Sequence, residues 1–298
     1  KMEKIWVKHY EDTVPEMVDV APFNSLVESF DDYTQRFADL NAFSNFGVKL
    51  TYRELALQAK QLAAYMQFEC GIKKGDRVAI MMPNLLQYPI ALFAVLSLGA
   101  VVVNINPLYT GRELIHSLND STAVAIIICK NFANTLESVL HQSHLKHVVV
   151  TGLGDRLGFK GKVINFVVKY IKKMVPKFDI PDAVSFNSAL QKGKKLPFSK
   201  VSLTSGDLAF LQYTGGTTGP SKGAMLTHGN MVANATQFRV WGKSIVEAGK
   251  DVTVTPLPLY HIFSLTVCCF SYIGLGVECM LITNPRDIDG FVNILIKN

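Results

Sequence analysis

The chain has 298 residues, 49% of them hydrophobic and 18% charged, which excludes a disordered or fibrous protein because enough apolar surface is present to build a core. The net charge is +6, but residues 156–178 carry seven basic and no acidic side chains, so the rest of the chain sums to −1. Basic residues confined to one segment argue against a nucleic-acid partner, because nucleic-acid-binding proteins spread basic and aromatic side chains over a face.

Helices and strands alternate along the chain. Ser25, Thr51 and Thr110 are each followed three positions later by a glutamate, a capping box that predicts a helix start. Apolar periodicity predicts further helices, and short β-branched runs predict strands. The expected helices are 88–98, 113–118, 132–141, 228–240 and 287–296, and the expected strands are 77–82, 101–105, 123–129, 147–151, 207–213, 252–255 and 277–283. Several strands are apolar on both faces, which predicts an α/β fold with largely parallel sheets covered by helices.

The segment 176–205 interrupts this alternation with scattered Pro, Ser, Lys and Gly, and we expect a boundary between two subdomains there. The longest uncharged apolar stretches, 89–103 and 262–277, fall short of the roughly 20 residues that span a bilayer, so no transmembrane helix is expected. The five cysteines show no C-x-x-C spacing and are expected to be reduced, as in a cytoplasmic protein.

The strongest functional signal is a segment rich in glycine and threonine that follows the expected strand 207–213. It reads Tyr213-Thr214-Gly215-Gly216-Thr217-Thr218-Gly219-Pro220-Ser221-Lys222-Gly223-Ala224. Glycines let backbone N–H groups approach an anion closely, threonine hydroxyls add donors, and a lysine supplies a point charge. The segment therefore predicts a polyphosphate site. It is not a Walker A loop, because Ser221 precedes the lysine and Gly223 follows it.

The same segment resembles the phosphate loop of the adenylate-forming superfamily, [ST]-[SG]-G-[ST]-[TS]-G-x-P-K-G, with Pro220 one place early and Ser221 before the lysine. The resemblance extends through 81–84, 103–110, 223–230 and 256–263. Over essentially the whole chain, the sequence is similar to bacterial long-chain fatty acid–CoA ligases. Members of that family are nearly twice as long, so the resemblance implies that residues 1–298 are a partial N-terminal AMP-binding domain without the C-terminal domain.

The resemblance implies a two-step reaction that uses ATP, Mg²⁺ and CoA. A long-chain fatty carboxylate attacks the α-phosphate of ATP to form an acyl-adenylate and pyrophosphate, and the CoA thiol then displaces AMP. The family pattern assigns Mg²⁺ to Thr214 and the triphosphate to the rest of the loop, with Lys222 as a catalytic residue. It places most of the CoA site outside these 298 residues, so we expect this stretch alone to be inactive.

His261 is the second candidate catalytic residue. By its chemistry alone, a single histidine between apolar residues is more often a core group. The resemblance instead places it beside the acyl carboxylate and the α-phosphate, with Phe263 and Leu265 lining the acyl pocket. Apolar residues at these two positions would pack into the core in any case.

The basic segment 160–177 has the pattern of an interfacial membrane helix. At about 100° per residue, Lys162, Asn165, Lys169, Lys172 and Lys173 share one arc, and apolar residues fill the opposite one. An ordinary helix with a solvated lysine face stays open as the alternative. We expect a cytoplasmic protein that can bind peripherally to an anionic membrane surface through 160–177. A homodimer is a separate possibility.

Other signals are weak. In 152–158 the third glycine comes one residue late for a dinucleotide fingerprint, and the histidines at 141, 144 and 147 lack further ligands for a metal site. Two other functions remain open: a ligase for a shorter or aromatic acid, and a non-catalytic module that binds a lipid surface or an acyl chain.

Overall fold

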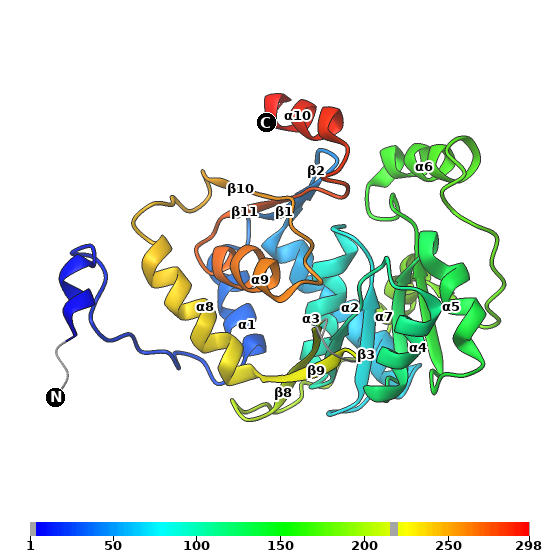
Figure 1. Ribbon diagram of the computed structural model, residues 1–298, viewed down its shortest axis with the longest axis horizontal. Coiled ribbons are helices and arrows are strands. Elements are labelled where there is room, and N and C mark those ends of the chain that lie inside the picture. Colours follow the sequence, from blue (N-terminus) through cyan, green and yellow to red (C-terminus); the bar gives the residue numbers. More distant parts are fainter. Residues whose placement is uncertain (1–3, 215–219, 298) are drawn as a thin grey trace.

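The computed structural model describes residues 4–214 and 220–297, which build two β-sheets covered by helices (Figure 1). The larger sheet has the strand order β7 (Val184–Ser185), β6 (His147–Thr151), β5 (Ala125–Cys129), β3 (Arg77–Met81), β4 (Val101–Asn104), β8 (Leu208–Thr214) and β9 (Lys222–Thr227). The smaller sheet has the order β10 (Val252–Thr255), β11 (Glu278–Leu281), β1 (Asn41–Asn45) and β2 (Val48–Thr51). Neighbouring strands are parallel except in the pairs β8–β9 and β1–β2. The expected α/β fold with largely parallel sheets is confirmed.

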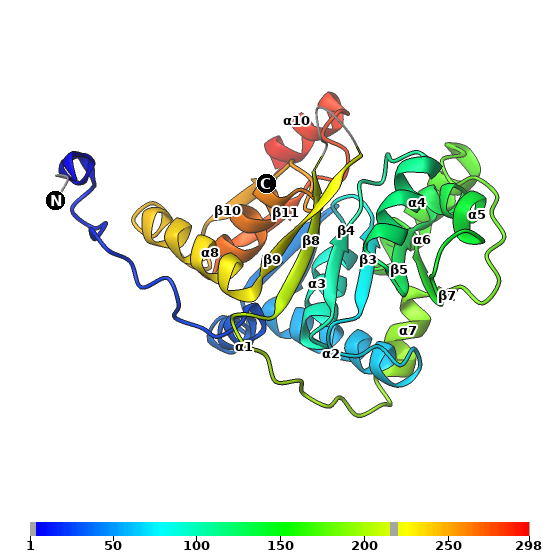
Figure 2. The same ribbon diagram turned by 60° about the horizontal axis from the view of Figure 1, so that its bottom comes forward.

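Helices cover both faces of the larger sheet (Figure 2). Their bounds are α1 Leu26–Arg36, α2 Tyr52–Phe68, α3 Gln87–Ser97, α4 Gly111–Asp120, α5 Ala133–Leu140, α6 Gly158–Phe166, α7 Phe186–Gly193, α8 His228–Gly242, α9 Ile262–Ser264 and α10 Ile288–Lys297, with single-turn or π-helical pieces at Ile5–His9, Lys130–Phe132, Val167–Ile171 and Leu265–Ser271. One face of β3 and β5 packs into the core formed by α1, α2, α3, α7 and the smaller sheet. The opposite face packs against α4 and α5.

The three expected helix starts are confirmed. Thr51 and Thr110 form complete capping boxes, in which the hydroxyl accepts from the third helical N–H and the glutamate accepts from the cap's own N–H. At Ser25 the hydroxyl also accepts from Glu28 N, but the Glu28 carboxylate accepts from Asn24 N instead. All seven expected strands and all five expected helices are present; the strands at 147–151 and 252–255 have the expected ends, and the other ends differ by at most two residues.

The sequence did not predict β1, β2, β7, β9, α7 or α9. Residues 222–224, expected as part of a loop, begin strand β9. The segment 176–205, where we expect a subdomain boundary, contributes β7 and α7, and the strands on both sides of it, β6 and β8, belong to the larger sheet. The chain changes sheets between β2 and β3 and again between β9 and β10.

All five cysteines are free thiols, and Cys129, Cys269 and Cys279 are buried in the core. Burial raises the pKa of the Cys129 thiol to about 12, so this group stays protonated. None of the helices within the described residues has the length and apolar character needed to cross a bilayer.

Candidate active site

The candidate phosphate segment joins β8 to β9. The two strands form an antiparallel pair in which Thr214 lies opposite Lys222 and Tyr213 lies opposite Gly223. The predicted site residues Gly215, Gly216, Thr217, Thr218 and Gly219 lie outside the described residues. The pairing brings a threonine hydroxyl and a lysine ammonium to the two ends of the glycine-rich stretch. Both side chains are exposed, and within 4–214 and 220–297 Lys222 forms no ion pair.

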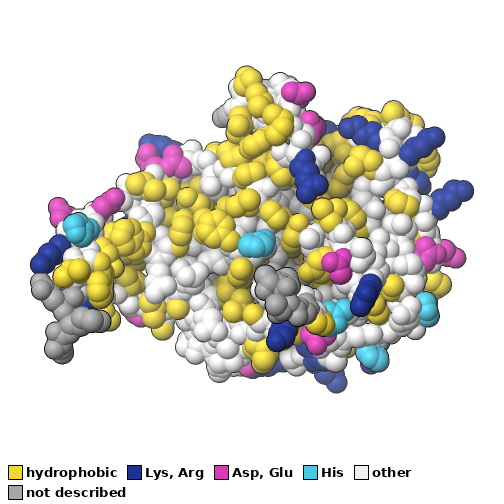
Figure 3. All heavy atoms as spheres, viewed as in Figure 1, with side chains coloured by type: hydrophobic (Ala, Val, Ile, Leu, Met, Phe, Trp, Pro, Cys, Tyr) yellow, Lys and Arg dark blue, Asp and Glu magenta, His cyan; other side chains and the backbone are white. Residues whose placement is uncertain are grey.

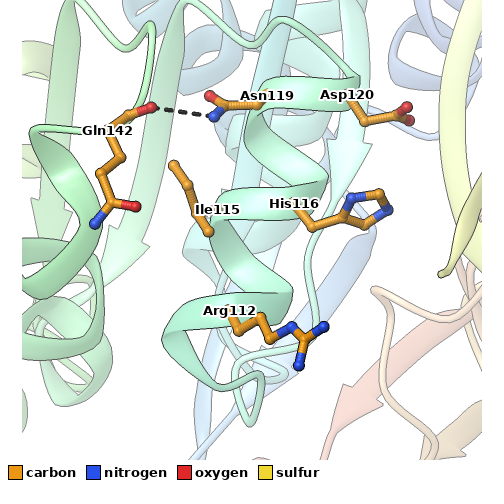
Figure 4. Close-up of a pocket in the computed structure, with 6 residues that line it drawn as sticks. All are labelled: Arg112, Ile115, His116, Asn119, Asp120 and Gln142. Carbon is orange, nitrogen blue, oxygen red and sulfur yellow. Dashed lines mark hydrogen bonds between the residues drawn. The ribbon is translucent and has the colours of Figure 1, made fainter.

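Tyr213 and Ser221 flank this stretch, and both contact helix α4. The buried Tyr213 hydroxyl donates to Asp120 Oδ2 at 2.5 Å, and His116 Nε2 donates to the Ser221 carbonyl at 2.9 Å. Burial, followed by the hydrogen bond to Asp120, raises the pKa of Tyr213. Figure 4 shows His116 and Asp120 on the same side of α4 as Arg112, while Ile115 and Asn119 lie toward Gln142, whose carbonyl accepts from Asn119 Nδ2 at 3.0 Å.

A chain of buried polar side chains connects β8 to the segment that carries His261. Asn104 Nδ2 donates to Gln212 Oε1 at 3.1 Å, and Gln212 Nε2 donates to the Tyr260 carbonyl at 2.9 Å. The Tyr88 hydroxyl lies 2.7 Å from Asn104 Oδ1 and 2.9 Å from the Leu259 carbonyl. The residue before His261 is therefore held by a side chain two positions before Thr214.

The side chain of Asn84 binds the turn at residues 255–259, which precedes His261. Its Nδ2 donates to the carbonyls of Thr255 and Leu257 at 3.0 and 2.9 Å, and its Oδ1 accepts from Leu259 N at 2.8 Å. These bonds join β10 of the smaller sheet to the turn after β3 of the larger one. Buried amides whose donors and acceptors are satisfied fix one geometry, because any displacement leaves backbone groups unpaired.

His261 caps the short helix α9 and is exposed. Its Nδ1 accepts from Phe263 N at 3.4 Å, so the proton of the neutral ring lies on Nε2, which is free to donate to a ligand oxygen. Phe263 is exposed and Leu265 is fully buried in the main core. The role of these two residues at an acyl pocket stays a prediction.

The structure thus brings together the flanks of the predicted phosphate segment, and it tethers the His261 turn to the same strand. The backbone pairing places Lys222 opposite Thr214, and His261 Nδ1 accepts from Phe263 N. The family resemblance marks residues 81–84 and 103–110, but it does not indicate the hydrogen-bonding roles of Asn84, Tyr88 and Asn104. It also missed Gln212, His116 and Asp120, which no motif marks.

Among the residues that the structure describes, no group of three or more His, Cys, Asp or Glu side chains could hold a metal ion. Thr214 contributes one oxygen. Mg²⁺ takes oxygen ligands and is usually held by one or two protein groups, with water and substrate phosphates completing its shell. A single hydroxyl at the end of β8 therefore fits a Mg²⁺ ion that arrives with a nucleotide.

Comparisons with known proteins agree with this geometry. A family model described as AMP-binding enzyme matches residues 30–297. The long-chain-fatty-acid–CoA ligase of Salmonella typhimurium is 54% identical over 297 residues, which are 99% of this chain and 53% of that protein. The chain therefore spans about half the length of the curated relatives it matches.

Solved structures share the fold. The crystal structure of the anthranilate CoA ligase AuaEII in complex with anthranoyl-AMP matches with a TM-score of 0.75 at 20% identity, covering 92% of this chain and 48% of that one. A long-chain-fatty-acid–CoA ligase (FadD1) from Archaeoglobus fulgidus matches with a TM-score of 0.72 at 24% identity, covering 92% of this chain and 50% of that one.

Proposed function

Since this chain belongs to the AMP-binding enzyme family, we propose that the whole protein is a long-chain fatty acid–CoA ligase that works through an acyl-adenylate. The observation that carries the proposal is the pairing of Thr214 with Lys222, which sets a hydroxyl and a cation at the two ends of a glycine-rich segment. The 54% identity to a long-chain-fatty-acid–CoA ligase over 99% of the chain supports the substrate class.

In the first step, a carboxylate oxygen bonds to the α-phosphorus of ATP, and the bond from that phosphorus to the β-phosphate oxygen breaks. Negative charge develops on the departing pyrophosphate, and the Lys222 ammonium stabilises it. His261 donates from Nε2 to an oxygen of the carboxylate or the α-phosphate and thereby orients the two reactants. In the second step the CoA thiol bonds to the acyl carbon, and AMP leaves with the oxygen that came from the acid.

Mg²⁺ would be held by Thr214 and by the phosphates of ATP. When bound, it would supply positive charge to the phosphate oxygens. The Thr214 hydroxyl contributes one ligand and fixes the end of β8 next to the nucleotide.

The test of the function is product analysis with the whole protein, ATP, Mg²⁺, CoA and a series of acids from octanoate to stearate, together with benzoate. We expect AMP and acyl-CoA in equal amounts, with kcat/KM rising as methylenes are added, because each buried CH₂ contributes about 0.8 kcal/mol. Lys222→Ala should lower kcat/KM, while the exposed control Lys146→Ala should not. Formation of ADP, or a preference for benzoate, would contradict the proposal.

Residues 1–298 tested alone should bind ATP in a Lys222-dependent way and form no acyl-CoA. Binding of fatty acid without any ATP binding would favour the alternative of a non-catalytic acyl-binding module. The homodimer expected from the sequence stays a prediction.

We also propose that helix α6 and the π-helical turn after it bind an anionic membrane surface. The large apolar side chains of Phe159, Val163, Phe166, Tyr170 and Ile171 are 51–81% exposed on the outer side of this helix. A contiguous exposed apolar patch is unfavourable in water and is typical of a surface that binds a membrane or another protein. Figure 3 shows hydrophobic and basic side chains gathered at the upper right, where Figure 1 places α6.

Some side chains of this helix contact the rest of the protein, and the others are exposed and can contact a membrane. Val168 is buried, and Asn165 Oδ1 accepts from Gly154 N while its Nδ2 donates to Asp155 Oδ1. Asn165, which helical spacing places in one arc with the lysines, uses its amide to anchor the helix to the loop after β6. Lys160 donates to the Phe46 carbonyl, which leaves Lys162, Lys169, Lys172 and Lys173 exposed at the flanks.

Vesicle sedimentation tests this surface. Replacing those four lysines by glutamine should weaken binding to phosphatidylglycerol vesicles by up to about a thousandfold, because each lysine near an anionic surface contributes about 1 kcal/mol. The control replaces four other exposed lysines, at 146, 194, 195 and 243, by glutamine, so that both variants have the same net charge. Equal binding by both variants would contradict the proposal.

A further inference from the structure

Helix α4 contacts both ends of the candidate phosphate segment. His116 and Asp120 lie one turn apart on the same side of the helix, as Figure 4 shows. Asp120 accepts from the Tyr213 hydroxyl at the end of β8, and His116 donates to the carbonyl of Ser221 just before β9. One rigid helix therefore grips the chain on both sides of the glycine-rich stretch.

The two contacts are strong and mutually supporting. The bond from Tyr213 to a carboxylate is charge-assisted and short, at 2.5 Å. The Tyr213 ring packs over the opposite strand, where a Cβ added at Gly223 would meet the ring at 3.2 Å. The His116 ring lies edge-on to the Tyr213 ring, with centroids 6.4 Å apart. A shift of the end of β8 would disturb the bond to Asp120, and a shift of the start of β9 would disturb the bond to His116.

Helix α4 is also held in the fold by contacts that do not involve His116 or Asp120. Leu114 and Leu118 are fully buried beneath the helix, and the Thr110 capping box fixes its start. The β8–β9 pair is also joined by its own backbone register from Leu208 to Thr214. The two side chains add a link between α4 and the strand ends to these contacts.

We propose that His116 and Asp120 are positioning residues that fix the two flanks of the glycine-rich segment and thereby set the affinity for the triphosphate of ATP, without contacting it. The inference rests on the proposed function, because it assumes that this segment binds ATP. Fixing the chain at Tyr213 and Ser221 reduces the conformational freedom that is lost when the ligand binds, and a smaller loss raises affinity.

Calorimetric titration with ATP tests the inference in the whole protein. Asp120→Ala should raise the Kd for ATP about tenfold and His116→Ala about threefold to tenfold, the ratios that follow from losing one charge-assisted or one neutral hydrogen bond. Asp120→Asn keeps an acceptor for the Tyr213 hydroxyl and His116→Gln keeps an amide donor, so both should restore most of the affinity. In steady-state assays the KM for ATP should rise while the KM for the fatty acid stays unchanged.

The matched controls are His144→Ala and Asp179→Ala, which remove exposed side chains of the same types. In a double-mutant cycle, Tyr213→Phe and Asp120→Ala together should weaken ATP binding no more than either change alone. If the alanine variants bind ATP as the unchanged protein does while Lys222→Ala does not, the inference is overturned and the proposed function stands. If the amide variants lose affinity as fully as the alanine variants, the hydrogen bonds are not the cause and the inference is also overturned. If the unchanged protein does not bind ATP, the proposed function fails and the inference fails with it.

Discussion

Replacing Asn84 by alanine should loosen the link between the two sheets. The side chain is 2% exposed and makes three hydrogen bonds, to the carbonyls of Thr255 and Leu257 and to the N–H of Leu259. Thr255 and Leu259 are buried, so their backbone groups would lose a partner that water does not easily replace, whereas Leu257 is half-exposed. At about 1 kcal/mol for each bond, the free energy of unfolding should fall by about 3 kcal/mol.

The assay is urea denaturation of the purified chain, combined with hydrogen exchange at Leu259. The exposed residue Asn134 on α5 gives the matched control, Asn134→Ala, which should change the free energy of unfolding by less than about 0.5 kcal/mol. Exchange of the Leu259 amide should become faster only in the Asn84 variant. A loss no larger than that of the control, or an unchanged exchange rate at Leu259, would refute the view that Asn84 holds the turn before His261.

Further predictions concern His228 and Gly161. His228 is fully buried with Nδ1 accepting from Leu26 N, and desolvation lowers its pKa to about 4. This histidine therefore becomes protonated near pH 6.5 in the unfolded chain but only near pH 4 in the folded chain. The free energy of unfolding falls as the pH drops through this window. In His228→Asn the loss of stability between pH 7 and 4.5 should be smaller by about 2 kcal/mol in urea denaturation, and an unchanged pH dependence would show that the histidine titrates freely. Gly161→Ala should destabilise the protein by about 3 kcal/mol, because a Cβ there would overlap the Gly154 carbonyl. Thermal unfolding measures this against the open position Gly206→Ala, and equal midpoints would mean that α6 does not pack closely on the loop after β6.

Local sequence signals located most elements of the fold. Capping boxes depend on residues three positions apart, and apolar periodicity depends on one helix or one strand, so both can be read from a short window. Strand β9 was missed because its first residues belong to the glycine-rich motif, whose composition is typical of a loop. Strand β7 is only two residues long, and its pairing with β6 carries no pattern of its own.

The contacts that position the site could not be predicted in the same way. Asn84 bonds to residues 171–175 positions away, and Gln212 bonds to Asn104 across 108 positions. His116 and Asp120 look like ordinary surface residues of an amphipathic helix until β8 and β9 are placed beside it. Helical spacing places Asn165 in one arc with the lysines, but spacing alone does not show that its amide bonds to Asp155 and to the Gly154 N–H.

The central claim is that a carboxylate oxygen attacks the α-phosphate of ATP at the segment 213–224. The most direct measurement supplies palmitate labelled with ¹⁸O in both carboxylate oxygens, together with ATP, Mg²⁺ and CoA, to the whole protein and weighs the nucleotide product. The account predicts AMP with one ¹⁸O atom, formed in proportion to palmitoyl-CoA, since the attacking oxygen stays on phosphorus when the thiol displaces AMP. Unlabelled AMP, or label recovered in inorganic phosphate beside ADP, would contradict it.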